Sequence, residues 1–523
     1  MSGTKAALKA INAAVLSQKY DEAVEQARKL LDSDPNSYQA NIFLGFAYSK
    51  QAKYSEAEKA YDAATKIKEG EPQAWQGLIQ LYEKQGGSRV EQYQTAALQL
   101  AQIYQAHDDK YKCQDVIDKF LAFAKNEGSR WQHRNSLEII LPDSPIYQYL
   151  EGRVHHPSHT YQIIAQITEF EEKERINKEI GERRTRLGAK INQVTVEVKR
   201  EVLKDSDLEE IYNKIIDWTT DDEIRRQYEE KLIKRCLDTL VVLPPGDSKT
   251  EKRSKLFKLA TDMVLIKHPY KLAWDIAIEW QDPEHVQGFD ANNLREYIDF
   301  FPASGLAQVL RGFMFSEISP FPPPPRTPAP GKNEKGDESS SDEDDGGGVT
   351  LDDFAMLAED RLAMMIEGMT DSPTSILAHR LMGEYYQFLD EHESVVELMR
   401  NANRLALEES NKIGKKFKNA SQSFKALLGT ALVFYQSPKN HPEAKALFDG
   451  LLKENPTSTP ALIGIGLIYE EEDDFVAAID FLERALQRDP TNIRVKAEAA
   501  WVKAINGDYL RGREELEECL PQI

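Results

Sequence analysis

The sequence predicts an all-α protein built as a solenoid of helical hairpins. The first observation is a repeat: the segment Tyr20-Asp-Glu-Ala23 recurs as Tyr54-Ser-Glu-Ala57, at an offset of 34 residues. The second is that the same order of small and large residues returns at 459–492. The third is that the chain between these two blocks keeps the apolar spacing of helices. Because one hairpin cannot bury its apolar face alone, neighbouring hairpins are expected to stack into a superhelix.

The period of 34 residues is that of the tetratricopeptide (TPR) repeat, a pair of antiparallel helices. In the repeat 38–71, small residues Gly45, Ala57 and Ala64 stand at positions 8, 20 and 27, where the two helices approach most closely. Tyr61 stands at position 24, where a large residue fills the space between hairpins. The pattern predicts further repeats at 4–37, from 72 onward, at 376–409, 425–458 and 459–492, and a partial one from 493.

We expect four segments along the chain: N-terminal TPR repeats at 4–130, degenerate helical repeats at 131–321, a disordered acidic loop at 322–350, and a second TPR block at 351–523. In the degenerate region, Leu187, Ile191, Val194 and Val198 follow a 4-3-4 spacing, which predicts one long helix over 161–204. The loop contains a proline run, a serine–acidic run and three glycines. It has too few apolar side chains to offset the entropy of ordering.

Composition and charge limit the classes of function. The formal net charge is −21, which argues against an autonomous nucleic-acid-binding domain because phosphates must be neutralised by cations. No secretory signal or membrane-spanning stretch is recognisable, and the three cysteines, Cys113, Cys236 and Cys519, are expected to be small buried residues. These features predict an intracellular protein in a reducing compartment, the cytoplasm, with the nucleus as an additional location.

A search for catalytic and ligand-binding motifs predicts no catalytic residue, no metal site and no cofactor, so we expect a non-enzyme. The histidines His155, His156 and His159 are interrupted by Pro157, which favours a polar turn over a metal site. No phosphate-binding loop, nucleophile elbow or zinc-protease motif occurs. Two basic groups are interpreted as solvated helix faces, with an accessory phosphate contact left open: Arg183, Arg184, Arg186 and Lys190, and Lys249, Lys252, Arg253, Lys255 and Lys258.

One kind of TPR adaptor, which holds a C-terminal carboxylate with basic and amide side chains, is not expected here. The five positions that such adaptors use are occupied by Leu8, Asn12, Phe43, Gln73 and Gly77. Only Asn12 has suitable chemistry. Without the cations, a bound carboxylate would be desolvated and unpaired.

The inner groove of a TPR array is lined by the first helices of its repeats, and this predicts a set of candidate protein-binding residues. They are Gln39, Ile42, Phe46, Lys50, Gln73, Gln76, Gln80 and Lys84, with Ser49 and Glu83 at neighbouring groove positions. Ile42 and Phe46 stand one turn apart and are expected to lie outside the seam of the hairpin. An apolar pair rimmed by polar residues is typical of a peptide anchor. The alternative is that a neighbouring helix of the solenoid covers them.

Three segments carry a resemblance to a known family: Ile42-Phe43-Leu44-Gly45, Ala74-Trp75-Gln76-Gly77-Leu78, and the stretch from Asp221 to Leu232, DDEIRRQYEEKL. In this order they resemble the start of the TPR subunit of the superkiller (Ski) complex. The resemblance covers most of the chain apart from the acidic loop. It implies that the chain is the N-terminal arm of a much longer scaffold.

The resemblance also implies partners. In that family the scaffold binds a DExH-type RNA helicase and a WD-repeat propeller subunit, and the assembly delivers RNA to the cytoplasmic exosome for 3′-to-5′ mRNA decay. The helicase and propeller contacts fall mainly on the C-terminal part of the family's scaffold, so an exosome-bridging factor is the partner expected for this arm. Direct nucleic-acid binding and membrane binding are not expected. Two alternatives are an adaptor of another pathway, chaperone or protein transport, and a regulatory subunit of an enzyme.

Overall fold

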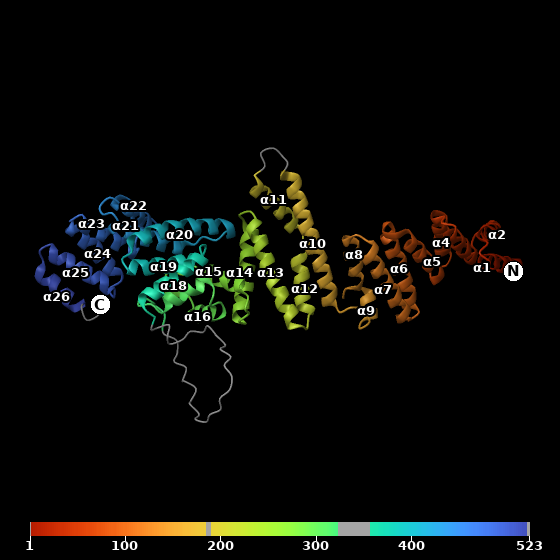
Figure 1. Ribbon diagram of the computed structural model, residues 1–523, viewed down its shortest axis with the longest axis horizontal. Coiled ribbons are helices and arrows are strands. Elements are labelled where there is room, and N and C mark those ends of the chain that lie inside the picture. Colours follow the sequence, from red (N-terminus) through yellow and green to blue (C-terminus); the bar gives the residue numbers. More distant parts are fainter. Residues whose placement is uncertain (1, 185–189, 323–355, 520–523) are drawn as a thin grey trace, which may run out of the picture. The chain divides into compact units, whose positions relative to one another are not determined.

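The computed structural model describes residues 2–184, 190–322 and 356–519 (Figure 1). Helices joined by short turns make up these described residues, and no β-strand occurs among them, which confirms the all-α prediction. The chain folds as two compact units, Met1–Arg235 and Cys236–Ile523, which are described separately below. The four segments expected from the sequence stay a prediction. The expected disordered loop at 322–350 lies, apart from Pro322, outside the described residues.

The first unit consists of consecutive antiparallel helices and two short 3-10 turns. The helices are α1 (Ser2–Leu16), α2 (Tyr20–Ser33), α3 (Tyr38–Lys50), α4 (Tyr54–Ile67), α5 (Pro72–Gln85), α6 (Val90–Ala106), α7 (Lys110–Glu127), α8 (Arg130–Leu137), α9 (Pro145–Leu150), α10 (Pro157–Arg184), α11 (Ile191–Lys204) and α12 (Leu208–Trp218). The 3-10 turns are η1 (Gly86–Arg89) and η2 (Glu138–Ile140). The next helix, α13 (Asp222–Val242), contains the boundary between the units.

The second unit continues the antiparallel arrangement. Its helices are α14 (Asp247–Leu265), α15 (Lys271–Glu279), α16 (Ala291–Phe300), α17 (Gly305–Met314), α18 (Ala358–Asp371), α19 (Ile376–Phe388), α20 (His392–Ile413), α21 (Lys418–Phe434), α22 (His441–Glu454), α23 (Thr459–Glu471), α24 (Phe475–Arg488), α25 (Ile493–Ile505) and α26 (Tyr509–Cys519), with one 3-10 turn, η3 (Val286–Gly288).

The predicted repeat register agrees with the helix boundaries. The helices α3, α5, α19, α23 and α25 begin at residues 38, 72, 376, 459 and 493, the first positions of the predicted repeats. The exceptions are the repeats at 4–37 and 425–458, whose first helices, α1 and α21, begin earlier, at Ser2 and Lys418.

Within a repeat, the small residue at position 8 faces the partner helix, as predicted, and the side chain that it meets there is the large residue at position 24. An ideal Cβ on Gly45 would lie 2.9 Å from the ring of Tyr61. The equivalent distances are 2.4 Å from Gly383 to Met399 Cε and 2.9 Å from Gly466 to Leu482 Cγ. Glycine at position 8 is therefore required by the close approach of the two helices rather than by its backbone conformation.

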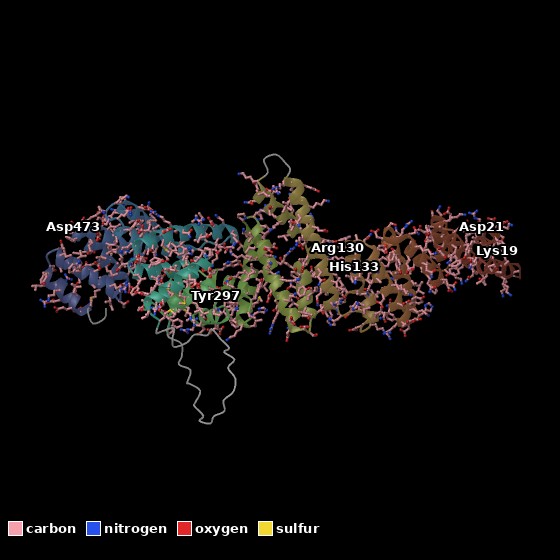
Figure 2. The ribbon with its side chains drawn as sticks, in the orientation of Figure 1. Lys19, Asp21, Arg130, His133, Tyr297 and Asp473 are labelled. Atoms are coloured by element: carbon pink, nitrogen blue, oxygen red, sulfur yellow. The ribbon has the colours of Figure 1, made fainter. Side chains whose placement is uncertain are left out.

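Most hairpin turns share one backbone feature that the sequence pattern did not reveal. A non-glycine residue with positive φ occurs at the turn between the two helices of a hairpin: Gln18, Ala52, Asp108, Lys267, Asp390, Gln436 and Asp473. Figure 2 labels Asp473 at the α23–α24 turn. The same turn joins α6 to α7 and α14 to α15, so hairpins of this type extend beyond the repeats recognised from sequence.

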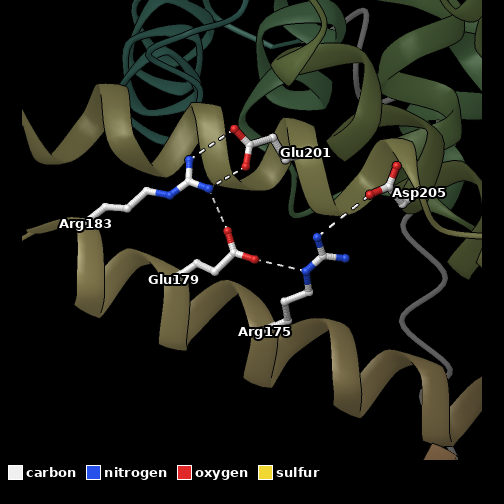
Figure 3. A network of polar contacts seen from close by, with 5 residues as sticks. All are labelled: Arg175, Glu179, Arg183, Glu201 and Asp205. Carbon is white, nitrogen blue, oxygen red and sulfur yellow. Dashed lines mark hydrogen bonds and ion pairs between the residues drawn. The ribbon is translucent and has the colours of Figure 1, made fainter.

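The expectation of one long helix over 161–204 is wrong. Helix α10 ends at Arg184, α11 begins at Ile191, and the two helices pack against each other as an antiparallel pair. Five charged side chains connect them (Figure 3). Arg183 donates hydrogen bonds to Glu201 at 3.1 and 2.5 Å and to Glu179 at 2.8 Å. The apolar spacing did not reveal that the chain forms two helices, because α10 and α11 are both helical and each keeps the spacing of a helix.

The ends of this ion-pair network hold the base of the α10–α11 hairpin. Arg175 lies 3.0 Å from Glu179 and 3.8 Å from Asp205, which follows α11. Hydrogen bonding to Arg183 lowers the pKa of the Glu201 carboxyl below its usual value. Arg183 is therefore engaged within the protein. Arg186, which belongs to the same predicted basic group, lies outside the described residues.

The core of the second unit forms where α14 to α19 meet. Trp274 and Tyr297 are fully buried there, and Tyr297 is labelled in Figure 2. Helices α17 and α18 approach closely through glycine, since an ideal Cβ on Gly305 would lie 2.4 Å from the carbonyl oxygen of Gly368. The helices on either side of residues 323–355 thus pack together as one pair.

An irregular segment after α15 is fixed by the N-termini of later helices. Asp282 accepts hydrogen bonds from the backbone N–H groups of Asn419 at 2.9 Å and Ala420 at 2.8 Å, in the first turn of α21. Arg380 of α19 donates to the carbonyl oxygens of Pro283 at 2.9 Å and Glu284 at 2.6 Å. The bonds to Asp282 satisfy helix-end donors of α21 that would otherwise need water.

Two members of the second basic group have structural roles at the C-terminus of α20. Lys249 is 4% exposed, and its ammonium donates to the carbonyl oxygen of Leu243 at 3.1 Å and approaches that of Asn411 at 3.5 Å. Arg253 donates to the carbonyl oxygen of Gly414. Cations at a helix C-terminus satisfy unpaired carbonyl groups.

Candidate peptide-binding groove

A groove with a volume of about 480 Å³ lies in the first unit between α5 and α7, with α6 as its floor. Three consecutive helices therefore form its sides and floor. It is lined by Gln76, Ile79, Gln80, Glu83, Tyr93, Leu100, Tyr104, Lys112, Asp115, Val116 and Lys119. The floor is partly apolar and the sides are polar, as is usual for sites that hold a ligand in a fixed orientation.

Two tyrosines of α6 connect the floor to α5. The amide of Gln76 donates a hydrogen bond to the Tyr104 hydroxyl at 2.7 Å, and the Tyr93 hydroxyl donates to Glu83 at 2.8 Å. Burial, and then the neighbouring Glu83 carboxylate, raise the pKa of Tyr93, so its phenol stays protonated. These bonds fix the orientation of α5 relative to α6.

The cations of the groove are already neutralised. Lys119 lies 2.8 Å from Asp115, and Lys112 lies 2.7 Å from Asp109, the N-cap of α7. Each hydrogen-bonded carboxylate raises the pKa of its lysine. A groove with paired charges and exposed amides favours a neutral polar ligand, such as the backbone of an extended peptide, over a highly charged one.

The structure places three of the predicted groove residues, Gln76, Gln80 and Glu83, in this groove. Gln80 is exposed on α5. The others lie outside its lining. Gln39 donates to Gln73 at 3.3 Å, which joins α3 to α5 along the exposed surface.

The side chains near Phe46 form a separate surface on α3. Phe46 is partly buried, and the Lys50 ammonium lies 5.3 Å from the centre of its ring. Lys84 of α5 donates to the Ser49 hydroxyl at 3.2 Å. Binding by Phe46, Lys50 and Lys84 stays a prediction.

Ile42 lies in the seam between hairpins, which agrees with the alternative that a neighbouring helix of the solenoid covers it. It packs against the buried cluster of Tyr38, Ala64 and Ala74, which joins α3, α4 and α5. The Tyr38 hydroxyl also accepts a hydrogen bond from the backbone N–H of Ala74 at 3.2 Å. A side chain partly covered in this way contributes to stacking of the repeats.

Sequence reasoning missed the contributions of α6 and α7 to the groove. The TPR register was lost at Gly86-Gly87-Ser88, where the structure has the η1 turn. The missed residues are Ile79, Tyr93, Leu100, Tyr104, Lys112, Asp115, Val116 and Lys119. The spacing of buried residues in α6, beginning with Val90, could have restored the register beyond the turn.

The structure also describes the surroundings of the histidine cluster and of the three cysteines. His156 bonds the hydroxyl of Ser158 at 3.0 Å, and His155 lies near His159, with ring centres 5.2 Å apart. Within the described ranges, no group of three His, Cys, Asp or Glu side chains could hold a metal ion. All three cysteines are buried and unbridged, which confirms their interpretation as small buried residues.

A helix that spans a membrane must be both long and apolar. In the part of the chain that the structure describes, none of the helices combines enough length with enough apolar character to traverse a membrane.

Comparison with family models supports the repeat assignment. One tetratricopeptide-repeat model matches residues 142–229, and another matches residues 14–82 and 437–502. The first match lies in the region that we interpreted as degenerate repeats. The matches at the two ends overlap the repeats that were recognised from the 34-residue period.

Curated relatives match nearly the whole chain. Superkiller protein 3 of Schizosaccharomyces pombe is 31% identical over 526 residues, which cover 99% of this chain and 38% of the relative. Superkiller protein 3 of Saccharomyces cerevisiae is 24% identical over 573 residues, covering 97% of this chain and 39% of the relative. Superkiller complex protein 3 of Homo sapiens is 26% identical over 167 residues, 32% of this chain and 10% of the relative.

The chain thus spans about two fifths of the length of the two yeast relatives. The match to the first of them runs through both units and through the TPR blocks at both ends. The chain belongs to the tetratricopeptide-repeat family of superkiller protein 3.

Proposed function

We propose that the chain is part of a non-catalytic scaffold of the Ski complex. The observation that carries this proposal is the 31% identity to superkiller protein 3 across 99% of the chain. A stack of helical hairpins suits a scaffold, since each added hairpin extends the surface on which partners bind. In this proposal the complete scaffold assembles a DExH RNA helicase and a WD-repeat subunit for cytoplasmic exosome-mediated 3′-to-5′ mRNA decay.

Within that assembly, the groove between α5 and α7 binds an extended peptide segment of an exosome-bridging factor. The side-chain amides of Gln76 and Gln80 each offer a donor and an acceptor, which matches the N–H and C=O groups of a peptide backbone. Tyr93 and Tyr104 supply the apolar floor. The paired charges on α7 favour a segment of low net charge.

The groove is tested by titrating the purified chain with the bridging factor and measuring the dissociation constant calorimetrically. The double substitution Gln76→Ala and Gln80→Ala is expected to weaken binding about thirtyfold, because two lost hydrogen bonds of about 1 kcal/mol each amount to about 2 kcal/mol. Gln92→Ala is the matched control, an exposed glutamine of α6 outside the groove. Equal affinity of the double variant and the control would contradict the groove as the binding site.

The assignment to the Ski complex is tested by affinity purification of the complete endogenous protein, followed by mass spectrometry. Helicase, WD-repeat subunit and exosome components are the expected proteins, recovered from the cytoplasmic fraction. Recovery of chaperones or transport receptors in their place would favour an adaptor of another pathway, and stoichiometric recovery of one enzyme would favour a regulatory subunit.

A further inference from the structure

A pocket in the second unit is separate from the groove in the first unit and has no part in the peptide binding proposed above. It has a volume of about 540 Å³ and lies among α15, α20 and the turn that leads from α18 into α19. Apolar side chains form part of its walls, among them Ile276, Trp280, Leu306, Leu405 and Phe417. Polar and charged groups occupy the remainder of the lining.

The charges that line this pocket do not balance. Five carboxylates line it, Asp275, Glu279, Asp371, Glu408 and Glu409, against two ammonium groups, Lys271 and Lys412. Both lysines are already paired, Lys271 with Asp275 at 2.8 Å and Lys412 with Glu409 at 3.1 Å. Glu408 is paired with Arg404 at 2.8 Å. Among the described residues, Glu279 and Asp371 are left without an ion pair.

Glu279 is the most desolvated of these carboxylates. It accepts a hydrogen bond from the Ser375 hydroxyl and one from the backbone N–H of Leu377 at 3.1 Å, at the start of α19. The backbone of Ile376 also contributes a hydrogen bond, and all of these donors are neutral. Burial raises the pKa of Glu279 to about 7, although these hydrogen bonds oppose the shift. The negative charge of Glu279 is therefore only partly compensated within the protein.

Other charged groups face this carboxylate from the surrounding elements. They are Lys271 and Asp275 on α15, Asp371 at the end of α18, Glu408, Glu409 and Lys412 on α20, and Lys415, which donates to the carbonyl oxygen of Trp280. Desolvation lowers the pKa of Lys415, and its bond to Trp280 directs it to a carbonyl oxygen.

We propose that this pocket receives the side chain of an arginine or a lysine from a segment of a partner protein. The cationic group would meet Glu279 and Asp371, which lack an internal cation. The methylene groups would lie on the apolar walls, as the stems of long basic side chains do at protein surfaces. An anionic ligand is disfavoured because the carboxylates outnumber the lysines and both lysines are paired.

The position of Glu279 at the start of α19 is a structural role in its own right, but it does not explain the space beside it. A carboxylate that only caps a helix needs backbone donors, and Glu279 has them. Helix capping accounts neither for the cavity beside Glu279 nor for Asp371, an exposed carboxylate at the rim of this cavity that also lacks an ion pair in the described part of the chain. This proposal is independent of the groove in the first unit.

The test uses the complete chain and three blocked tripeptides: acetyl-Gly-Arg-Gly-amide, its lysine equivalent, and the neutral citrulline equivalent. Methyl NMR of an isoleucine-labelled sample measures binding, because Ile276 and Ile376 line the pocket. The arginine and lysine peptides are expected to shift these signals in a saturable manner at millimolar concentrations. The citrulline peptide, which matches arginine in shape but carries no charge, is expected to leave them unchanged.

The pH dependence identifies the carboxylate. Between pH 8 and pH 6 the dissociation constant of the arginine peptide is expected to rise about tenfold, because a group with a pKa near 7 goes from mostly ionised to mostly protonated. In Glu279→Gln this dependence should disappear, with affinity at pH 8 reduced about tenfold. Asp371→Asn, an exposed change that leaves the cap intact, should weaken binding at both pH values.

Glu397→Gln is the matched control, since Glu397 is exposed on α20 and outside the pocket. It is expected to bind the peptide as the unmodified chain does. Three results would overturn the proposal: no saturable shift with either basic peptide, equal shifts with citrulline, or unchanged affinity in both Glu279→Gln and Asp371→Asn.

Discussion

The ring of Phe448 lies so close to Gly464 that an ideal Cβ on Gly464 would be 2.0 Å from Cζ of the ring. Tyr61 has the same relation to Gly77, where the distance from the ideal Cβ to the ring is 2.4 Å. In each case the aromatic residue stands at position 24 of one repeat and the glycine at position 6 of the next. Successive hairpins therefore stack through the same contact in both units.

This contact makes Gly464 intolerant of a larger side chain. Gly464→Ala is expected to lower the free energy of unfolding by about 1–3 kcal/mol, because Phe448 is fully buried and must move. Gly45→Leu, against Tyr61, should cost a similar amount. Thermal denaturation measures both. Gly450→Ala is the control, since a Cβ there meets nothing within 4 Å, and it should raise stability by about 0.5–1 kcal/mol. An unchanged melting temperature in Gly464→Ala would contradict the described packing.

Ala52 has a φ of 59° at the α3–α4 turn, a left-handed conformation that disfavours a Cβ. Ala52→Gly is therefore expected to stabilise the protein by about 1 kcal/mol, measured by thermal or denaturant unfolding. The matched control is Ala63→Gly, the same change within helix α4, which should destabilise by about 1 kcal/mol. If both variants lost stability equally, the left-handed turn at Ala52 would be wrong.

The raised pKa of Glu279 predicts how stability varies with pH. Its pKa is about 7 in the folded chain against 4.5 ordinarily, so between these values the folded state binds more protons than the unfolded state. The contribution of Glu279 to the free energy of unfolding is then fully present below about pH 4.5 and is lost as pH rises through about 7. Denaturant unfolding from pH 5 to 8 should show a steeper loss in the unmodified chain than in Glu279→Gln. Parallel curves would contradict the raised pKa.

Phe46→Ala tests the second predicted binding surface, on α3. Phe46 is only partly buried, so its removal is expected to change folding little and to weaken binding of the exosome-bridging factor by about 1–2 kcal/mol. The helicase should stay bound in the complete complex. Calorimetric titration and thermal unfolding measure the two quantities. Lost stability with unchanged affinity would identify Phe46 as a core residue and would leave the groove at Gln76 and Gln80 unaffected.

The residues that fix the repeats could be interpreted from the sequence because their roles are local. The offset of 34 residues assigned Gly45, Ala57 and Ala64 to the close approach of the two helices, and the structure has Gly45 against Tyr61 of the partner helix. Where two helices approach closely, only glycine or alanine fits, so the positions of these small residues in the sequence indicate the repeat register. The same argument could not assign Ala52 to a left-handed turn, since alanine there has no distinguishing chemistry.

Features that depend on contacts between distant residues could not be predicted in this way. Periodicity from Ile191 to Val198 indicated helix correctly but contained no signal for the antiparallel packing that brings Arg183 to Glu201. The groove was only partly predicted, because Tyr93 and Tyr104 lie beyond the point where the TPR register was lost. The partners of Asp282 lie 137 and 138 residues along the chain, a separation that no local pattern indicates.

The segment from Glu279 to Glu284 also bears on the order in which the second unit folds. Arrays of hairpins that contact only their neighbours can fold from any starting point and propagate one repeat at a time. Here Glu279 binds the start of α19 and Asp282 binds the start of α21, so both helix starts contact a segment that lies 98 and 137 residues earlier in the chain. Contacts of such long range slow folding and join the elements into one cooperative transition. The second unit should therefore unfold as a whole, without the gradual loss of single repeats that is typical of regular arrays.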